Sequence, residues 1–519
     1  MSTQKRFNTL KWAVVFTVLF TVVTVNAFSG GQGESSKAQD KNNSVREITV
    51  ASIADPAVGL PEVEAAINKI TVPRINTRVK FLPIESGAYS QQISLMMASG
   101  EKIDLVRGTS FGTVSFSVMH AQHQLMDITD LLPKYAPDLI RTVTEIIPDF
   151  LEGTRVNGRI HSVSGFFNKV NSDYFLGRAD ILDKHNIDIY GVKGLDDVGN
   201  ILGVLKRNEP NQVPIVTYQR DASALILEGG SFYDDFSNPV HFDTLGDSAN
   251  RLAVVFLSNP ENVVNLYKTD NYRKMLERVH DWYKKGYVYK DALINTEIQE
   301  ILVRNNIGIT WTASSEIGVE VAKEERTGYK IRAVKAAPGM ITTTTMTRIF
   351  WGVPVHSKEP EAALKFLNLM YTDPDINNLL AWGIEGRDYE VKSDGTVGFP
   401  AGITSSNAPY HSMDFRWGNQ FITKVWTGNP PDLREQARKE NQNASSSPLL
   451  GFSFDTAPIQ NEIAMLSNII SQYRPGLESG TIDPAQGLPA FIKALDGGGA
   501  EKVIAEIQKQ LNAWKSTKK

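Results

Sequence analysis

A helix that ends on a glycine and gives way at once to a strand constrains the fold of this chain more than any other feature. In residues 89–106, YSQQISLMMASGEKIDLV, apolar side chains recur at helical spacing from Tyr89 to Met97. Gly100 then suits a helix end, because the terminating residue often takes a left-handed backbone conformation. IDLVR at 103–107 predicts a strand. The chain therefore re-enters a sheet directly after the helix.

Two more strands and a helix precede this segment. ITVASI at 48–53 and RVKFLPI at 78–84 predict strands, and PEVEAAINKI at 61–70 predicts a helix with Pro61 in its first turn. The order βαβαβ indicates a parallel sheet with right-handed crossovers. Ligands at such sheets bind beyond the carboxyl ends of the strands. Polar and aromatic residues stand at those ends, namely Ser52, Asp55, Thr109, Ser110 and Phe111.

The same alternation of helices and strands starts again after about residue 170 and predicts a second α/β lobe. Helices are predicted at 178–187, 196–210 and 269–288, and strands at 213–218, 307–312 and 329–339. A strand at 349–355 and a helix at 359–371 follow, and the last 120 or so residues are dominated by helical patterns.

The N-terminus is typical of a secretory signal. A basic start precedes Trp12–Val25, an apolar run that also contains threonine, and small residues suited to cleavage end at Ala27. The run is shorter than the roughly 20 residues that span a bilayer. Residues 28–45 predict a flexible polar tether. We therefore expect an extracytoplasmic protein, in a periplasm or at a cell surface.

Composition excludes several classes of function. The 519-residue chain contains no cysteine, so disulfides, thiolate chemistry and lipid anchoring through cysteine are excluded. Its net charge of −4 argues against a nucleic-acid partner. The sequence contains no phosphate-binding loop, and we expect neither a cofactor nor a metal.

Several segments resemble the extracellular solute-binding proteins of ABC importers, family 1, with the type II periplasmic-binding fold. In that family a helix rich in tyrosine, leucine and methionine ends in ASG, and an aspartate starts the third strand. QLMDITDLLPKYAPDL at 124–139 and VNGRIHSVSG at 156–165 look like the next elements. EPEAALKFLNLMYTDPDINNLLAWGIEGRDYEV at 359–391 resembles the large oligosaccharide-binding branch of the LipO/LplA type. The segments at 447–464 and 500–514 are similar to the C-terminal domain of that branch. Most relatives carry a lipobox cysteine, which this chain lacks.

The resemblance covers roughly residues 46–519 and implies an α/β, two-lobe fold with an interlobe cleft and a helix-rich C-terminal extension. We expect lobe 1 to comprise 46–168 and 338–372, and lobe 2 to comprise 169–337 and 373–519. The resemblance implies capture of an oligosaccharide in the cleft without chemistry on it. It also implies permease subunits of an ABC transporter as partners, and a monomer.

Aromatic residues are the further candidates for the ligand site. A sugar ring offers an apolar face on which aromatic rings stack, and hydroxyls that bond to polar side chains. Beside the residues at the strand ends, the candidates are Phe166, Phe167, Arg220, Asp221, Trp311, Trp351, Trp382, Glu385, Tyr389 and Trp417. Packing in a core is the competing interpretation for each aromatic residue.

Two other functions stay open. A secreted hydrolase would use Ser110, in the G-x-S-x-G pattern at 108–112, or paired carboxylates such as Asp234 and Asp235. A surface adhesin or sensor subunit would share the fold without transport. We expect His120 and His123 to be surface or loop residues rather than metal ligands.

Overall fold

The computed structural model describes residues 44–54, 57–109, 112–217, 230–247 and 249–518. Residues from Val45 onward belong to one compact unit. Asp55, Ser110, Phe111, Arg220 and Asp221, together with the expected signal and most of the tether, lie outside the described residues.

The first sheet confirms the expected βαβαβ order. Its strands lie in the order β2 (Thr77–Ile84), β1 (Arg46–Ile53), β3 (Leu105–Thr109), β15 (Ile349–Gly352) and β6 (Val163–Ser164). β1 pairs in parallel with β2 and β3, whereas β15 is antiparallel to β3. The helix α2 (Ser86–Ser99) ends at Gly100, which has φ 70° and donates its N–H to the carbonyl of Met96. The glycine thus returns the chain to the sheet as predicted.

Helices cover both faces of the first sheet. One face shares a core with α1 (Leu60–Ile75), α4 (Leu132–Tyr135), α5 (Pro137–Ile146), α12 (Pro360–Thr372), α13 (Pro374–Trp382) and α14 (Leu433–Gln442). The other face packs on α2 and α3 (Phe116–Ala121). Val50 and Leu105 point to the first core, and Ala51 and Val106 to the second. This alternation is the two-residue period of a strand.

The second sheet is of mixed direction. Its strands lie in the order β14 (Ile331–Ala337), β7 (Ser172–Arg178), β13 (Gly308–Ser315) and β8 (Val213–Ile215). β13 runs antiparallel to β7 and parallel to β8. The accompanying helices are α6 (Ala179–Lys184), α7 (Leu195–Asn208), α9 (Gln299–Arg304) and α10 (Val319–Thr327). Trp311 lies in the core on one face, and Phe175 and Ile215 join the core on the other.

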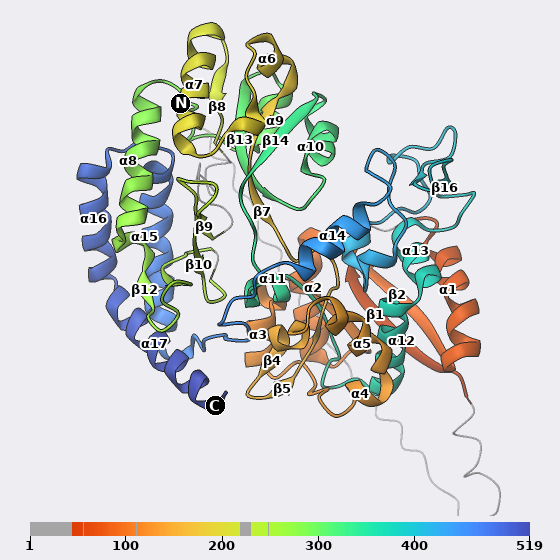
Figure 1. Cartoon of the computed structure of the whole chain (residues 1–519). Helices are drawn as coiled ribbons and strands as arrows, with labels where there is room; N and C mark the ends of the chain where they lie inside the picture. Colours follow the sequence, from red (N-terminus) through yellow and green to blue (C-terminus); the bar gives the residue numbers. More distant parts are fainter. Residues whose placement is uncertain (1–43, 55–56, 110–111, 218–229, 248, 519) are drawn as a thin grey trace, which may run out of the picture. The chain divides into compact units, whose positions relative to one another are not determined.

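The helical C-terminal region completes that last core. α15 (Gln460–Glu478), α16 (Pro484–Gly497) and α17 (Ala500–Thr517) pack with α8 (Asp270–Lys284) (Figure 1). A third sheet adds β12 (Val264–Asn265), β11 (Ala253–Phe256), β10 (Val240–Asp243) and β9 (Ser231–Phe232). Two short hairpins pair β4 (Arg155–Val156) with β5 (Arg159–Ile160) and β16 (Glu390–Val391) with β17 (Val397–Gly398). The tail is therefore part of a shared core and not a separate appendage.

The chain passes between the two main sheets at residues 165–171 and returns through 338–348, which include α11 (Thr343–Thr347). It leaves the first core again only after α14. Ile376 and Leu380 on α13, and Ala437 on α14, belong to the core of the first sheet. The expected lobe boundary at residue 372 therefore differs from the boundary between cores, because the apolar face of α13 packs against α1 and α12. Within the described parts of the chain, no helix is both long and apolar enough to cross a membrane.

Candidate functional site

Three side chains form a row across the first sheet near its carboxyl edge. Trp351 on β15 pairs directly with Arg107 on β3. The pairing of β1 with β3, continued by one residue, sets Ser52 beside Arg107 on the other side. All three are buried, and all point to the face that carries the first core, since each lies an even number of residues from a core position. We call Ser52, Arg107 and Trp351 the edge row.

A loop from the C-terminal part of the chain covers the edge row. Trp417 stacks on Trp351 with ring centroids 5.9 Å apart and planes 15° apart. Its Nε1 donates to Ser412 Oγ at 3.2 Å, which fixes the indole. The turn immediately before it, Asp414–Arg416, places Arg416 near this edge, where its positive charge lowers the pKa of Arg107. Residues some 300 positions apart in the sequence thus meet at this edge.

Arg107 is a buried cation with little compensation. Burial lowers the pKa of its guanidinium to about 10, and the nearby positive charge of Arg416 lowers it further, while Tyr89 acts in the opposite direction. The Tyr89 hydroxyl donates to the backbone carbonyl of Arg107 at 2.5 Å, so this bond fixes the strand and does not engage the guanidinium. In the described part of the chain, the Arg107 Nε and the Trp351 Nε1 are buried without a hydrogen-bond partner. The edge row therefore has unused donors.

Residues 383–389, with the sequence GIEGRDY, contact the start of α1, close to the carboxyl end of β1. The Arg387 guanidinium binds Asp388 at 2.7 and 2.9 Å and donates to the Gly59 carbonyl at 3.2 Å. Asp388 also accepts from the backbone N–H of Ile384 at 2.8 Å. These bonds pin the segment to the start of α1 and leave Arg387 and Asp388 mutually satisfied. This part of the segment is structural.

Glu385 and Tyr389 of the same segment line a pocket between α1 and α13, with a volume of about 680 Å³. The Tyr389 hydroxyl lies 3.4 Å from the Glu385 carboxylate. Burial and that carboxylate raise the pKa of Tyr389 to about 12. The pocket also contains Glu62, Lys69 and Lys424, so charges of both signs surround it.

A polar network joins the crossing segments between the two main sheets. Asn168 donates to Glu440 at 3.0 Å and accepts from the side chain of Asn441 at 2.9 Å. The backbone N–H of Lys169 donates to Asn441 at 2.9 Å, and Lys335 on β14 binds Glu440 at 2.8 Å. The network links the 165–171 connection, β14 and α14, so it ties the crossing chain segments together.

One buried and one half-buried ionisable side chain stand beside this network. Lys169 is 2% exposed, and its ammonium lies 3.7 Å from the centre of the Phe167 ring. Burial lowers the pKa of Lys169 well below its usual range. Burial also raises the pKa of Glu316, which follows the carboxyl end of β13, to about 7, although Arg348 acts to lower it. These groups place two ionisable side chains with shifted pKa values where the two main sheets connect.

The structure brings only some of the predicted site residues together. Ser52, Trp351 and Trp417 meet at the first sheet, with Thr109 buried at the end of β3. Phe166 packs in the first core, Phe167 beside Lys169, and Trp311 in a core of the second sheet. Trp382 and Tyr389 share a small separate core, and Glu385 is exposed. Contact of these residues with a ligand stays a prediction.

Sequence reasoning missed Arg107, which it read only as the last residue of a buried strand. The signal was available, because a charged residue at the end of an otherwise apolar strand needs a partner or a function. Arg416, the residue before Trp417, is likewise absent from the predicted site residues.

The other polar motifs have structural explanations. His120 is partly buried, and its ring lies 4.6 Å from that of His161 in an edge-to-face contact, so burial and His161 lower its pKa. Among the described residues, no group of three or more histidine, aspartate or glutamate side chains could hold a metal ion. Asp234 pairs with Arg278, and Asp235 accepts bonds from Ser237. The two carboxylates therefore bind separate partners and do not face each other as a catalytic pair would.

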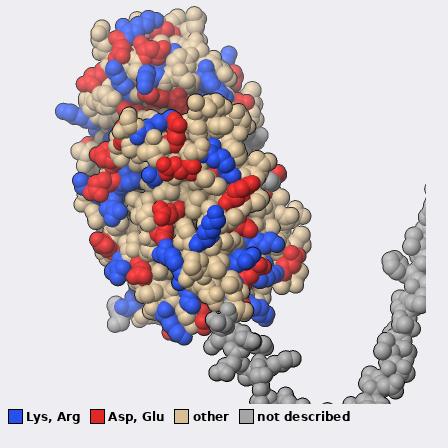
Figure 2. Space-filling model, turned by 90° about the vertical axis from the view of Figure 1, so that its right-hand side faces the viewer, with Lys and Arg blue, Asp and Glu red and all other residues tan. Residues whose placement is uncertain are grey.

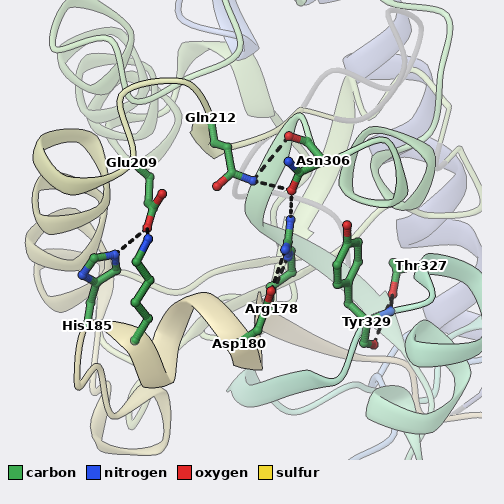
Figure 3. A network of polar contacts seen from close by, with 9 residues as sticks. Arg178, Asp180, His185, Glu209, Gln212, Asn306, Thr327 and Tyr329 are labelled. Carbon is green, nitrogen blue, oxygen red and sulfur yellow. Dashed lines mark hydrogen bonds and ion pairs between the residues drawn. The ribbon is translucent and has the colours of Figure 1, made fainter.

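A further polar network lies around β7 of the second sheet (Figure 3). Arg178 binds Asp180 and Asn306, and Gln212 donates to Asn306 at 2.8 Å. Nearby, His185 and Lys184 share one oxygen of Glu209, at 2.7 and 2.5 Å. Each of these groups already has a partner, so the network holds the sheet and its helices together.

Charge is evenly mixed on the face of the molecule seen in Figure 2. Acidic and basic side chains alternate there without a broad region of one sign. A nucleic-acid surface would instead gather lysine and arginine.

Comparisons with known proteins agree with this architecture. The family described as bacterial extracellular solute-binding protein matches residues 65–384, and a domain of unknown function (DUF3502) matches 448–516. A carbohydrate ABC transporter substrate-binding protein of Streptococcus pneumoniae serotype 4 is 26% identical over 498 residues, which are 94% of each chain.

Solved structures of similar proteins share the fold. The N-glycan transport solute binding protein (NgtS) of Streptococcus pneumoniae superposes with a TM-score of 0.77 at 24% identity, over 91% of this chain and 100% of that chain. A solute binding protein of Bifidobacterium longum infantis, associated with an HMO-binding ABC transporter, gives 0.63 at 14% identity, over 90% of this chain and 99% of that one. The α/β fold with a helical C-terminal region is therefore that of two-lobe solute-binding proteins.

Proposed function

Because the chain belongs to the bacterial extracellular solute-binding proteins, we propose that it captures an oligosaccharide outside the cytoplasm and delivers it to the permease subunits of an ABC importer. The ligand is bound and released without chemical change. The relative that is similar over 94% of this chain carries the description of a carbohydrate transporter subunit, which supports a sugar as the solute.

The edge row is the observation that carries this proposal. Ser52 and Arg107 place polar groups at the carboxyl edge of the parallel strands of the first sheet, and the stacked indoles of Trp351 and Trp417 lie beside them. Sugar rings need this combination of an apolar platform and hydrogen-bonding groups. Ligands of open α/β sheets bind beyond this edge. The candidate ligand residues of the second sheet would contribute from the opposite side of the cleft.

Binding is coupled to closure about the crossing segments. Asn168, Asn441 and Lys335 belong to the network that joins these segments, so rotation of one sheet against the other is concentrated there. A ligand that contacts both sides favours the closed form by its differential affinity for the two forms. The permease then recognises the closed form.

Export uses the N-terminal 27 residues as a signal and residues 28–45 as a tether. Since the chain has no cysteine, the mature protein is not anchored through a lipidated cysteine. It works as a monomer beside the membrane-bound permease.

The test is a thermal-shift screen of the secreted form against a panel of oligosaccharides, followed by product analysis for every compound that shifts the melting temperature. A ligand at 100 times its dissociation constant adds about 2.7 kcal/mol of stability. Stabilisation with the sugar recovered intact is the expected result. Stabilisation with cleaved sugar would instead establish a hydrolase, and no shift from any oligosaccharide would contradict the proposal.

A further inference from the structure

Arg107 is a charged side chain in a place that ordinarily excludes charge. It lies in the middle of the five-stranded first sheet and is 5% exposed. Among the residues that the structure describes, none forms an ion pair with its guanidinium, and its Nε has no hydrogen-bond partner. Burial of a cation without a counter-charge is costly. Such a residue is explained when a partner arrives from outside the chain.

The surroundings of Arg107 add donors and positive charge. Trp351, directly opposite on β15, is fully buried, and its Nε1 likewise has no acceptor in the described structure. Arg416 directly precedes Trp417, whose ring stacks on that of Trp351, and its positive charge lowers the pKa of Arg107. In the described structure, no side-chain hydrogen bond or ion pair engages Arg416. The site therefore has an excess of hydrogen-bond donors and two positive charges.

The two acidic side chains that the structure describes near this site, Asp388 and Asp414, are already used. Asp388, which acts on the same buried tyrosine, Tyr410, as Arg416 does, is bound by Arg387 at 2.7 Å. Asp414, in the same turn as Arg416, forms an ion pair with Arg434. Neither carboxylate is left over to neutralise the Arg107 and Arg416 pair.

The missing complement is an anion rather than water. A water molecule could accept from Trp351 Nε1 and Arg107 Nε, but it would not reduce the repulsion between two guanidinium groups. A carboxylate or sulfate supplies both acceptor oxygens and negative charge, and arginine binds such groups through paired N–H donors.

We propose that the oligosaccharide bound by this protein is acidic, and that its carboxylate or sulfate group is held by Arg107 and Arg416 beside Trp351. The inference rests on the proposed function and specifies the substrate class for the same site. The aromatic pair Trp351 and Trp417 then lies next to the charged sugar unit. Neutral oligosaccharides leave both arginines without a counter-charge and bind more weakly.

The test compares acidic oligosaccharides with their neutral counterparts by isothermal titration calorimetry. The probes are uronate-containing, sialylated and sulfated oligosaccharides, each beside its carboxyl-reduced, desialylated or desulfated form. We expect at least one acidic probe to bind about tenfold or more tightly than its neutral counterpart. We also expect this preference to shrink as salt concentration rises. A preference for the uronate or sialylated probe would identify the bound group as a carboxylate, and a preference for the sulfated probe would identify it as a sulfate.

Variants locate the effect. Arg416→Gln and Arg107→Gln should each remove most of the preference for the acidic probe over its neutral form. Arg416 lies in a partly exposed turn, so its variant tests the idea even where the buried Arg107 variant fails to fold. Arg141→Gln is the matched control, because the side chain of Arg141 is 75% exposed and pairs only with Asp138.

The outcomes separate the two proposals. Tight binding of neutral oligosaccharides, unchanged in Arg416→Gln, would overturn the acidic specificity and leave oligosaccharide capture standing. An acidic preference that persists in both variants would overturn the assignment to these arginines. Failure of every oligosaccharide, acidic or neutral, to bind would overturn the proposed function and this inference with it.

Discussion

Two arginines, one in each main sheet, are equally buried but differently surrounded. Arg178 ends β7 and is 4% exposed, and Arg107 in β3 is 5% exposed. Arg178 binds the Asp180 carboxylate at 2.6 and 3.1 Å, receives support from Asn306, and lies 3.7 Å from the centre of the Tyr329 ring (Figure 3). Arg107 has no comparable partner among the described residues.

The difference separates a structural charge from one that awaits a partner. Around Arg178 the chain supplies a carboxylate, an amide oxygen and an aromatic face, so the cost of burial is offset locally. Around Arg107 it supplies a second cation and an indole donor, which add to the cost. Equal burial of the same residue type therefore does not imply the same role.

The largest expected effect is the loss of stability in Arg178→Met. Removing one partner of a buried ion pair costs about 3–5 kcal/mol, and since Asp180 is half exposed we expect the lower end, about 3 kcal/mol. Urea unfolding of the variant and of the parent measures this difference. A change below about 1 kcal/mol would show that the Figure 3 network is not what holds this end of the sheet.

Glu316 sharpens the comparison as a half-buried carboxyl whose loss of hydration is only partly offset. Its folded-state pKa of about 7 exceeds the ordinary 4.5, since burial outweighs the attraction of Arg348, Arg434 and Lys169 and Asp414 adds repulsion. The folded state thus holds the proton more tightly, and this contribution to stability is full below about pH 4.5 and lost as pH rises through 7. The free energy of unfolding should fall by about 2 kcal/mol across that window.

Glu316→Gln isolates this effect, because the variant lacks the titrating group. Unfolding free energies of parent and variant, measured from pH 4.5 to 8, should diverge as the parent loses stability and the variant does not. Parallel curves would mean that the carboxyl is ionised throughout and is well compensated.

Arg107→Met should have the opposite sign to Arg178→Met. The variant removes a buried charge that lacks a partner and keeps most of the apolar stem, so the ligand-free protein should be as stable or more stable, by about 1 kcal/mol. The measurement is urea unfolding without sugar. A loss of 2 kcal/mol or more would indicate that Arg107 has a structural partner, and the contrast with Arg178 would disappear.

Tyr329→Leu tests the smallest element of the comparison. The ring lies over the Arg178 guanidinium, and such a contact contributes about 0.5–1 kcal/mol at a partly exposed site. Leucine keeps apolar contact but not the attraction to the cation, so a loss of this size is expected from the urea midpoint. Combining the change with Arg178→Met should cost little more than Arg178→Met alone, because the two residues interact directly.

Local patterns determined much of the first sheet. Gly100 marked a helix end because its left-handed conformation is a local demand on the backbone, and the structure has φ 70° there. The strands around Val50 and Leu105 could be predicted because each is an apolar run, and the helices between them follow from the spacing of apolar residues. Both are local patterns of the sequence. The resemblance of the 359–391 segment indicated the family that residues 65–384 match.

Tertiary structure alone decided the partners. Trp351 meets Arg107 through strand register, and Trp417 stacks on Trp351 from a loop more than 60 residues further on. The assignment of α13 and α14 to the first core likewise depends on which apolar face each helix finds, which periodicity does not specify. The sequence by itself determined the elements and the family, since these follow from local spacing. Only the fold decided that Arg178 is neutralised and that Arg107 has no counter-charge among the described residues, because a charge is compensated by whatever lies within a few ångströms of it in space.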